Sequence, residues 1–215
     1  MPRHHVASEL LVEYAAGALP EAEALVVATH LALCPACRAE VAGYEEVGGA
    51  LLDRLEPAPV DADALDRLLG CLDESQPAAK PLPIPSRPPV LPEPLRSYLG
   101  CDLGQVAWRR LARGIEEYEL PLADATGSRT VLLRVKSGRA LPWHTHEGQE
   151  LTLVLAGGFT DGDEHFRRGD VDWADPTVNH RPLADPGEDC ICLATTHGRL
   201  RLTGLIGRMA NLFIR

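Results

Sequence analysis

Residues 138–157 read GRALPWHTHEGQELTLVLAG, and this stretch decides the fold of the second half of the chain. It carries the spacing His144-x-His146-x3-Glu150, and His180 follows about thirty residues later. Side chains two apart on a strand point the same way, so His144 and His146 face one interior and Glu150 meets them from the next strand. Three imidazoles and one carboxylate suit zinc, iron, manganese or nickel, and such a site can keep a coordination position open. The stretch therefore predicts a metal site within a β-rich domain.

The full spacing around these residues resembles a known motif. It is Gly138-x5-His144-x-His146-x3-Glu150-x6-Gly157, which is similar to the first motif of the cupin family. The second cupin motif is incomplete, because Val178 and Ala184 stand where glycine and asparagine are usual, although His180 is present. The resemblance implies an antiparallel β-barrel in which His180 is the fourth ligand.

The chain divides at a proline-rich segment. Eight of its 18 prolines fall within residues 77–94, where they favour extended backbone and cannot donate hydrogen bonds to a sheet. Short β-rich runs at 130–135, 151–155 and 190–196 follow it, separated by glycine and aspartate turns. We therefore expect a multidomain α and β protein: an all-α domain at 1–76, a linker at 77–94 and an antiparallel β domain at 95–215.

The first third of the chain carries helix signals. Ser8 is placed to cap a first helix, which Gly17 ends. Pro20 begins a second helix, and Pro35 begins a third. A weaker fourth helix is expected over residues 61–72.

A second set of metal-binding side chains lies in these helices. His30 and Cys34 are four residues apart and share one side of a helix, and Cys37 follows one turn later. His4 and His5 stand at the start of the chain, and only one of them is needed to complete the set. Two thiolates and two imidazoles are typical of a closed, structural zinc site.

The net negative charge comes from the helical part. Residues 1–75 hold 14 acidic and 4 basic side chains, a formal charge of −10, which equals that of the whole chain. Phosphates repel such a surface, so direct nucleic-acid binding is not expected, whereas a basic protein partner fits. A solubilising surface without a partner is the plainer interpretation.

The location is expected to be cytoplasmic, with no membrane partner. The chain begins with no export signal, and no apolar run approaches the roughly eighteen residues of a membrane span. Six cysteines in such a chain are expected to be thiols or metal ligands.

Several segments together resemble one family. His4-His5-Val6, Glu13-Tyr14-Ala15-Ala16-Gly17 and Ala28-Thr29-His30-Leu31-x2-Cys34-x2-Cys37-Arg38-Ala39 are similar to the zinc-binding anti-sigma domain. With a cupin behind them, and with Leu141-Pro142-Trp143-His144-Thr145-His146-Glu147-Gly148, the chain resembles the ChrR-type anti-sigma factors.

The resemblance implies a regulator and not an enzyme. Its helical domain is then expected to bind an extracytoplasmic-function sigma factor and block its access to RNA polymerase. Release is expected on an oxidative signal, singlet oxygen or organic peroxide, sensed through the cupin and carried across the 77–94 linker. The implied zinc ligands are His5, His30, Cys34 and Cys37. The implied cupin ligands, for zinc or another divalent metal, are His144, His146, Glu150 and His180.

A metal-dependent dioxygenase or isomerase is the main alternative, because cupin motifs also occur in such enzymes. Catalysis needs a general base or substrate anchors beside the metal, for which the candidates are Trp143, Glu147, Trp173 and Arg181.

Two further pairs of residues are open to interpretation. Cys190 and Cys192 face one side of a strand, either as packing residues or as an oxidant- or metal-responsive pair. His165 and His197 are expected in solvent-facing turns.

Overall fold

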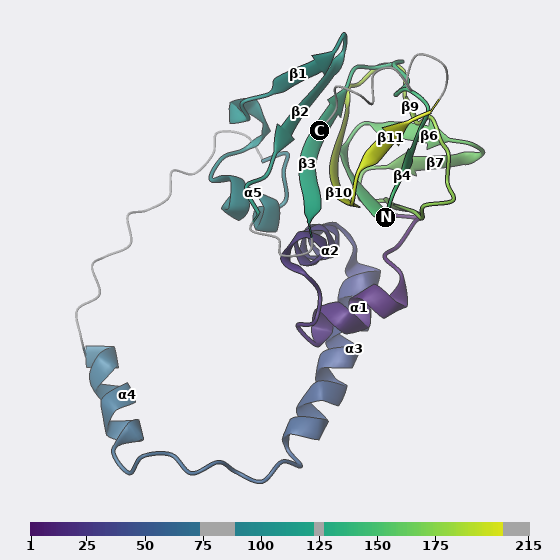
Figure 1. Cartoon of the computed structure of the whole chain (residues 1–215). Helices are drawn as coiled ribbons and strands as arrows, with labels where there is room; N and C mark the ends of the chain where they lie inside the picture. Colours follow the sequence, from purple (N-terminus) through teal and green to yellow (C-terminus); the bar gives the residue numbers. More distant parts are fainter. Residues whose placement is uncertain (74–88, 123–126, 204–215) are drawn as a thin grey trace.

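The computed structural model describes residues 1–73, 89–122 and 127–203 (Figure 1). Most of the predicted linker at 77–94 lies outside the described residues. The helices are α1 (Ser8–Ala15), α2 (Glu21–Leu33), α3 (Pro35–Leu52), α4 (Ala64–Asp73) and α5 (Glu93–Leu99), with a short 3-10 turn at Leu103–Gln105.

Most of the predicted helix boundaries agree with the structure. Pro35 is the first residue of α3, and Gly17 follows α1 with a positive φ of 66°. Pro20 was predicted as the first residue of the second helix, but α2 begins one residue later, at Glu21, and Pro20 is its N-cap. The capping role predicted for Ser8 is wrong: Ala7 is the N-cap, and the Ser8 hydroxyl instead donates a hydrogen bond to Glu40 Oε1 at 2.7 Å, tying α1 to α3.

The second half of the chain consists of short strands. They are β1 (Arg109–Ala112), β2 (Ile115–Glu119), β3 (Ser128–Val135), β4 (His144–His146), β5 (Glu150–Ala156), β6 (Gly158–Asp161), β7 (Glu164–Arg167), β8 (Val171–Ala174), β9 (Leu183–Ala184), β10 (Cys190–His197) and β11 (Leu200–Leu202). The order in the largest sheet is β1-β2-β3-β10-β5-β8, and two smaller sheets contain β7-β6-β9 and β11-β4. Every strand pair is antiparallel, as predicted. Within the described residues the three sheets do not close into one barrel, so the closed barrel stays a prediction.

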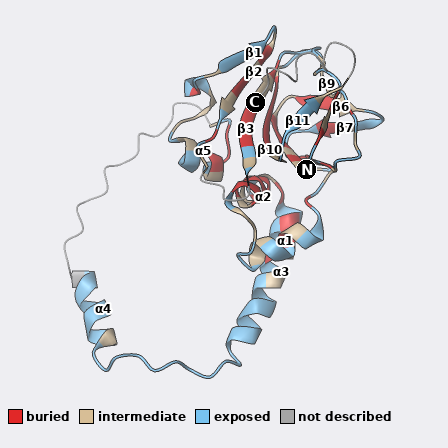
Figure 2. Cartoon of the chain, viewed as in Figure 1, coloured by how far each residue is buried: buried red, intermediate tan, exposed pale blue. Residues whose placement is uncertain are grey.

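Helix α2 lies between the large sheet and the helices α1 and α3, and it also contacts α5 (Figure 1). Its residues are buried on nearly every side, as Figure 2 shows in red. Val26 and Val27 of α2 belong to the same buried cluster as Leu95 of α5 and Leu153 and Leu193 of the sheet. The helical and β-rich parts therefore share one hydrophobic core.

The C-terminal half of α3 and all of α4 extend away from this body (Figures 1 and 2). Leu55 in the segment between them is exposed, and so are large apolar side chains of the two helices: Val47, Leu51, Leu52, Leu65, Leu68, Leu69 and Leu72. In the described part of the chain, no single helix is both long and apolar enough to cross a membrane. Helices α2 and α3 pass that test only together, by length and composition, and they meet at a bend of 118°.

Candidate metal centres

The structure brings the four predicted ligands of the N-terminal site together. His5 Nδ1 lies 3.3 Å from both Cys34 Sγ and Cys37 Sγ, and His30 Nε2 lies 3.2 Å from Cys37 Sγ. One ligand atom from each residue falls within 4.8 Å of the others. This arrangement arises locally because Cys34 ends α2 and precedes α3, so the turn between the helices presents both thiols beside His30.

The protonation of these groups fits a cation. Burial, and then the neighbouring Cys34 thiol, raises the pKa of Cys37 to about 12, so without a cation this thiol stays protonated at neutral pH. Burial lowers the pKa of His30, which keeps its imidazole neutral and able to coordinate. A divalent metal favours the thiolates and accepts neutral imidazoles.

The structure also separates the two histidines at the start of the chain. The His4 ring packs against Phe166 of β7, with ring centroids 4.4 Å apart. His5, one residue later, points to the thiols. The group therefore contains His5 and not His4, the choice that the residues alone left open.

The second predicted group is also assembled. His144 and His146 lie on β4, Glu150 begins β5, and His180 forms an isolated bridge with His144. The three histidines are buried, and one ligand atom of each of the four residues lies within 4.8 Å of the others. His146 Nε2 lies 3.1 Å from His180 Nε2. Burial, and then His180, lowers the pKa of His146 to about 4, so this ring is neutral near pH 7.

Surrounding groups orient this second set. His144 Nδ1 donates to the Pro142 carbonyl at 2.9 Å, and His180 Nδ1 lies 2.5 Å from Asp161 Oδ2, which leaves each Nε2 free to coordinate. Thr196 donates to Glu150 Oε2 at 2.9 Å. His146 Nδ1 is buried without a hydrogen-bond partner, although it lies 3.3 Å from Glu150 Oε2, because the two groups are not aligned for a bond. A cation among these donors fits that orphaned nitrogen.

Three of the four residues proposed as catalytic are exposed, unlike the buried histidines of the metal group. They are Trp143, Trp173 and Arg181. Glu147 pairs with Arg201, with Oε1 2.9 Å from Arg201 Nε, and accepts the Arg199 amide; these contacts lower its pKa. A surface cavity of about 570 Å³ is lined by other residues, including Val90, Leu155, Arg168 and Asp185.

Cys190 and Cys192 lie on one face of β10, as predicted. Both are buried free thiols, and their Sγ atoms are 3.6 Å apart. The hydrogen bond from Cys190, followed by burial, raises the pKa of Cys192 well above its usual value. As free thiols, the two cysteines pack against Val154 and Phe159 in a second buried cluster.

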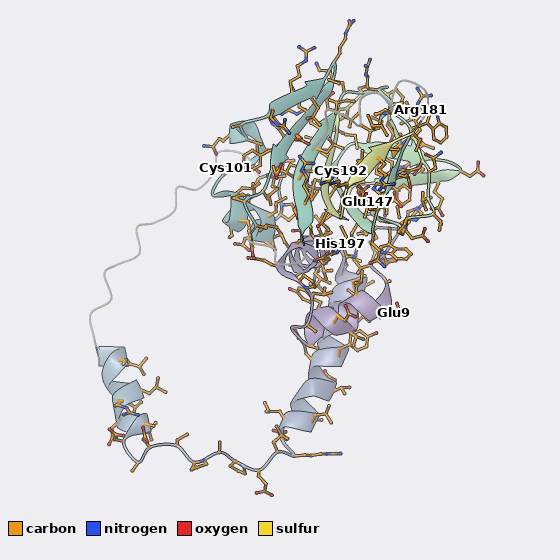
Figure 3. The ribbon with its side chains drawn as sticks, viewed as in Figure 1. Glu9, Cys101, Glu147, Arg181, Cys192 and His197 are labelled. Atoms are coloured by element: carbon orange, nitrogen blue, oxygen red, sulfur yellow. The ribbon has the colours of Figure 1, made fainter. Side chains whose placement is uncertain are left out.

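The contacts between the helical and β-rich halves were not predicted from the sequence. His197 Nε2 pairs with Glu23 of α2, so the turn expected to face solvent instead joins the halves (Figure 3). His165, also expected in solvent, pairs with Asp185 at 2.7 Å. The contact of Asp161 with His180 was not predicted either. Asp161 ends β6, and its sequence neighbourhood gives no sign of a role at the metal group.

Known proteins match both halves of the chain. Residues 5–38 match the family described as "Putative zinc-finger", and residues 97–200 match the family described as "ChrR Cupin-like domain". The zinc-finger match and the His/Cys group together indicate zinc at the N-terminal site.

Two known proteins match nearly the whole length of this chain. The chain is 41% identical over 213 residues to the Anti-sigma-E factor ChrR of Cereibacter sphaeroides, covering 99% of this chain and 98% of that protein. It is also similar to ChrR in the crystal structure of Rhodobacter sphaeroides SigE in complex with the anti-sigma ChrR, with a TM-score of 0.79 and 41% identity over 91% of this chain and 100% of that one. The cupin-like β domain and the zinc-finger helices thus occur here in the same combination, and the chain belongs to the ChrR family of anti-sigma factors.

Proposed function

We propose that this protein is an anti-sigma factor. Its helical domain holds an extracytoplasmic-function sigma factor inactive in the cytoplasm, and an oxidative signal received by the cupin domain releases it. The observation that carries the proposal is the full-length similarity to ChrR, which has been crystallised in complex with SigE. Domain boundaries at 1–76, 77–94 and 95–215 are part of the proposal.

The exposed apolar face of α4 supports a protein partner. Leu65, Leu68, Leu69 and Leu72 follow the spacing of a single helix face, and all four are exposed. A monomer gains nothing from exposing such a face, so the face fits a partner that covers it. The sigma factor is the occupant that family membership favours.

Charge supports the same partner. The excess negative charge of the chain lies within residues 1–75, and α3, α4 and the segment between them carry a large share of it. Sigma factors present basic DNA-binding surfaces, so an acidic helical domain attracts and covers them. The enzyme alternative has no comparable support, because the relatives that match along the chain are regulators.

Each domain holds one metal site, and the two sites have different roles. In the proposal, His5, His30, Cys34 and Cys37 hold a structural zinc that fixes the helices. His144, His146, Glu150 and His180 would hold zinc or another divalent metal. An oxidant would act by altering the ligands around this metal. The Pro142 carbonyl and Asp161 orient two of the imidazoles, and burial of the histidines keeps bulk water away from them.

Co-purification tests the proposal directly. The full chain, expressed with its sigma factor, is expected to form a complex that weakens with added salt. Leu69→Asp on α4 is expected to weaken the complex at least tenfold. Leu111→Asp on β1 is the matched control, because Leu69 and Leu111 are 49% and 48% exposed. Equal loss of binding in both variants, or no complex with the wild type, contradicts the proposal.

A further inference from the structure

The turn between β7 and β8 of the cupin domain contacts the N-terminal zinc site. We infer that this turn, through Gly169 and Asp170, positions two of the four zinc ligands, so that the zinc site is completed by the cupin domain. The inference rests on the proposed zinc ligands and is independent of the identity of the protein partner.

Gly169 acts on His30. The backbone carbonyl of Gly169 accepts a hydrogen bond from His30 Nδ1 at 2.8 Å, and this contact is buried. A histidine that donates from Nδ1 has its lone pair on Nε2, and His30 Nε2 is the atom that faces Cys37. The cupin turn therefore fixes both the tautomer and the ring orientation that the zinc needs.

Asp170 acts on the segment that carries His5. Its buried carboxylate accepts the backbone amides of Arg3 and His4 on Oδ1, at 2.5 and 3.1 Å, and the amide of Arg167 on Oδ2 at 2.8 Å. The Val171 amide donates back to the His4 carbonyl at 3.1 Å. These bonds fix the backbone immediately before His5, and hydrogen bonds to a charged acceptor are the stronger kind.

The cupin turn packs against the helical domain at Gly169. Gly169 has a φ of +92°, and a Cβ at this position would lie 2.8 Å from Pro2 Cγ and 3.6 Å from Leu33 Cβ. Only glycine allows this backbone conformation and this approach together. The turn is therefore packed against the N-terminal segment and the end of α2 at once.

The same turn is bonded to the strand that begins at Glu150. Gly169 donates its amide to the Val154 carbonyl at 2.8 Å, and the Val154 amide donates to the Asp170 carbonyl at 3.0 Å. Glu150 and Val154 both belong to β5, and β8 pairs with β5 directly after the turn. A movement of β5 thus reaches His30 through one turn, without passing through residues 77–94.

Metal exchange in the full-length protein tests the inference. Cobalt(II) replaces zinc, and coordination by thiolates gives a charge-transfer absorption that a site with three histidines and one glutamate lacks. Loss of this absorption in Cys34→Ser assigns it to the N-terminal site. With excess chelator, Asp170→Ala is expected to lose the absorption about 10- to 100-fold faster than the wild type, the range for removing a group that orients a metal ligand.

Asp102→Ala is the matched control. Asp102 also accepts two backbone amides, those of Val90 and Leu91, but it does not touch the zinc site. Its exchange rate is expected to match the wild type. Asp170→Asn keeps an oxygen that accepts the Arg3 and His4 amides, and it is expected to recover most of the wild-type rate.

The outcomes separate the two proposals. Equal exchange rates in Asp170→Ala and the wild type, or equal acceleration in Asp170→Ala and Asp102→Ala, overturn the inference. Absence of the thiolate absorption from the wild type overturns the zinc site itself.

Discussion

Replacing Leu95 by alanine tests whether the helical and cupin domains share one core. Leu95 lies on α5, is fully buried, and belongs to the cluster that also contains Val26 and Val27 of α2. The substitution removes three buried carbons, at about 0.8 kcal/mol each, or about 2.4 kcal/mol in total. The cavity left behind adds to this, so the free energy of unfolding is expected to fall by about 3 kcal/mol, within the range of about 2–5 kcal/mol for such changes.

The assay follows unfolding in urea with two probes. The three tryptophans, Trp108, Trp143 and Trp173, all lie in the cupin part, so their fluorescence reports on that part. Circular dichroism of helices reports mainly on α1 to α4. One shared core predicts that both probes change at the same urea concentration, and that Leu95→Ala lowers this concentration for both.

Leu111→Ala is the control for the same chemical change at an exposed site, and it is expected to alter stability by no more than about 0.5 kcal/mol. Two separate transitions, of which Leu95→Ala shifts only the tryptophan signal, would refute a shared core. The two domains would then be independent units joined by the linker.

Further predictions concern metal and backbone. The purified protein is expected to carry one metal ion at each of the two four-residue groups, and elemental analysis counts them. Cys37→Ser is expected to remove the N-terminal ion and to destabilise the shared core, which circular dichroism follows. A wild type with a single ion contradicts this. Gly157→Ala is expected to be less stable than Gly162→Ala by about 1–3 kcal/mol. Both glycines have positive φ, +62° and +57°, but only at Gly157 does a Cβ approach a backbone oxygen, that of Asp189, to 2.6 Å. Thermal unfolding of the two variants measures the difference, and equal melting temperatures contradict it.

The metal groups were predictable from the sequence because their spacing is local. His30 lies in the last turn of α2, and Cys34 and Cys37 are the N-cap and a first-turn residue of α3. His144 and His146 point the same way on one strand. The choice between His4 and His5 was not predictable, because it depends on Phe166 and Asp170, which are distant in the sequence.

The joint between the domains was not predictable either. Helix α2 is apolar on nearly all sides, which indicates a buried helix, but its sequence does not show that the cupin sheet is one of the surfaces that cover it. Glycine followed by aspartate, as at 169 and 170, is typical of any turn, and the contacts of these residues with His30 and with the start of the chain depend on the folded arrangement. The Ser8 cap was mispredicted because Glu40 competes for its hydroxyl.

In the proposed function, the cupin domain controls a sigma factor that the helical domain holds. A sigma-dependent reporter measures this control in cells that carry the wild type or His146→Ala and are exposed to light with a singlet-oxygen sensitiser. We expect low reporter activity in the dark for both, and strong induction by light only with the wild type. Equal induction with His146→Ala, or high activity in the dark with the wild type, would contradict it.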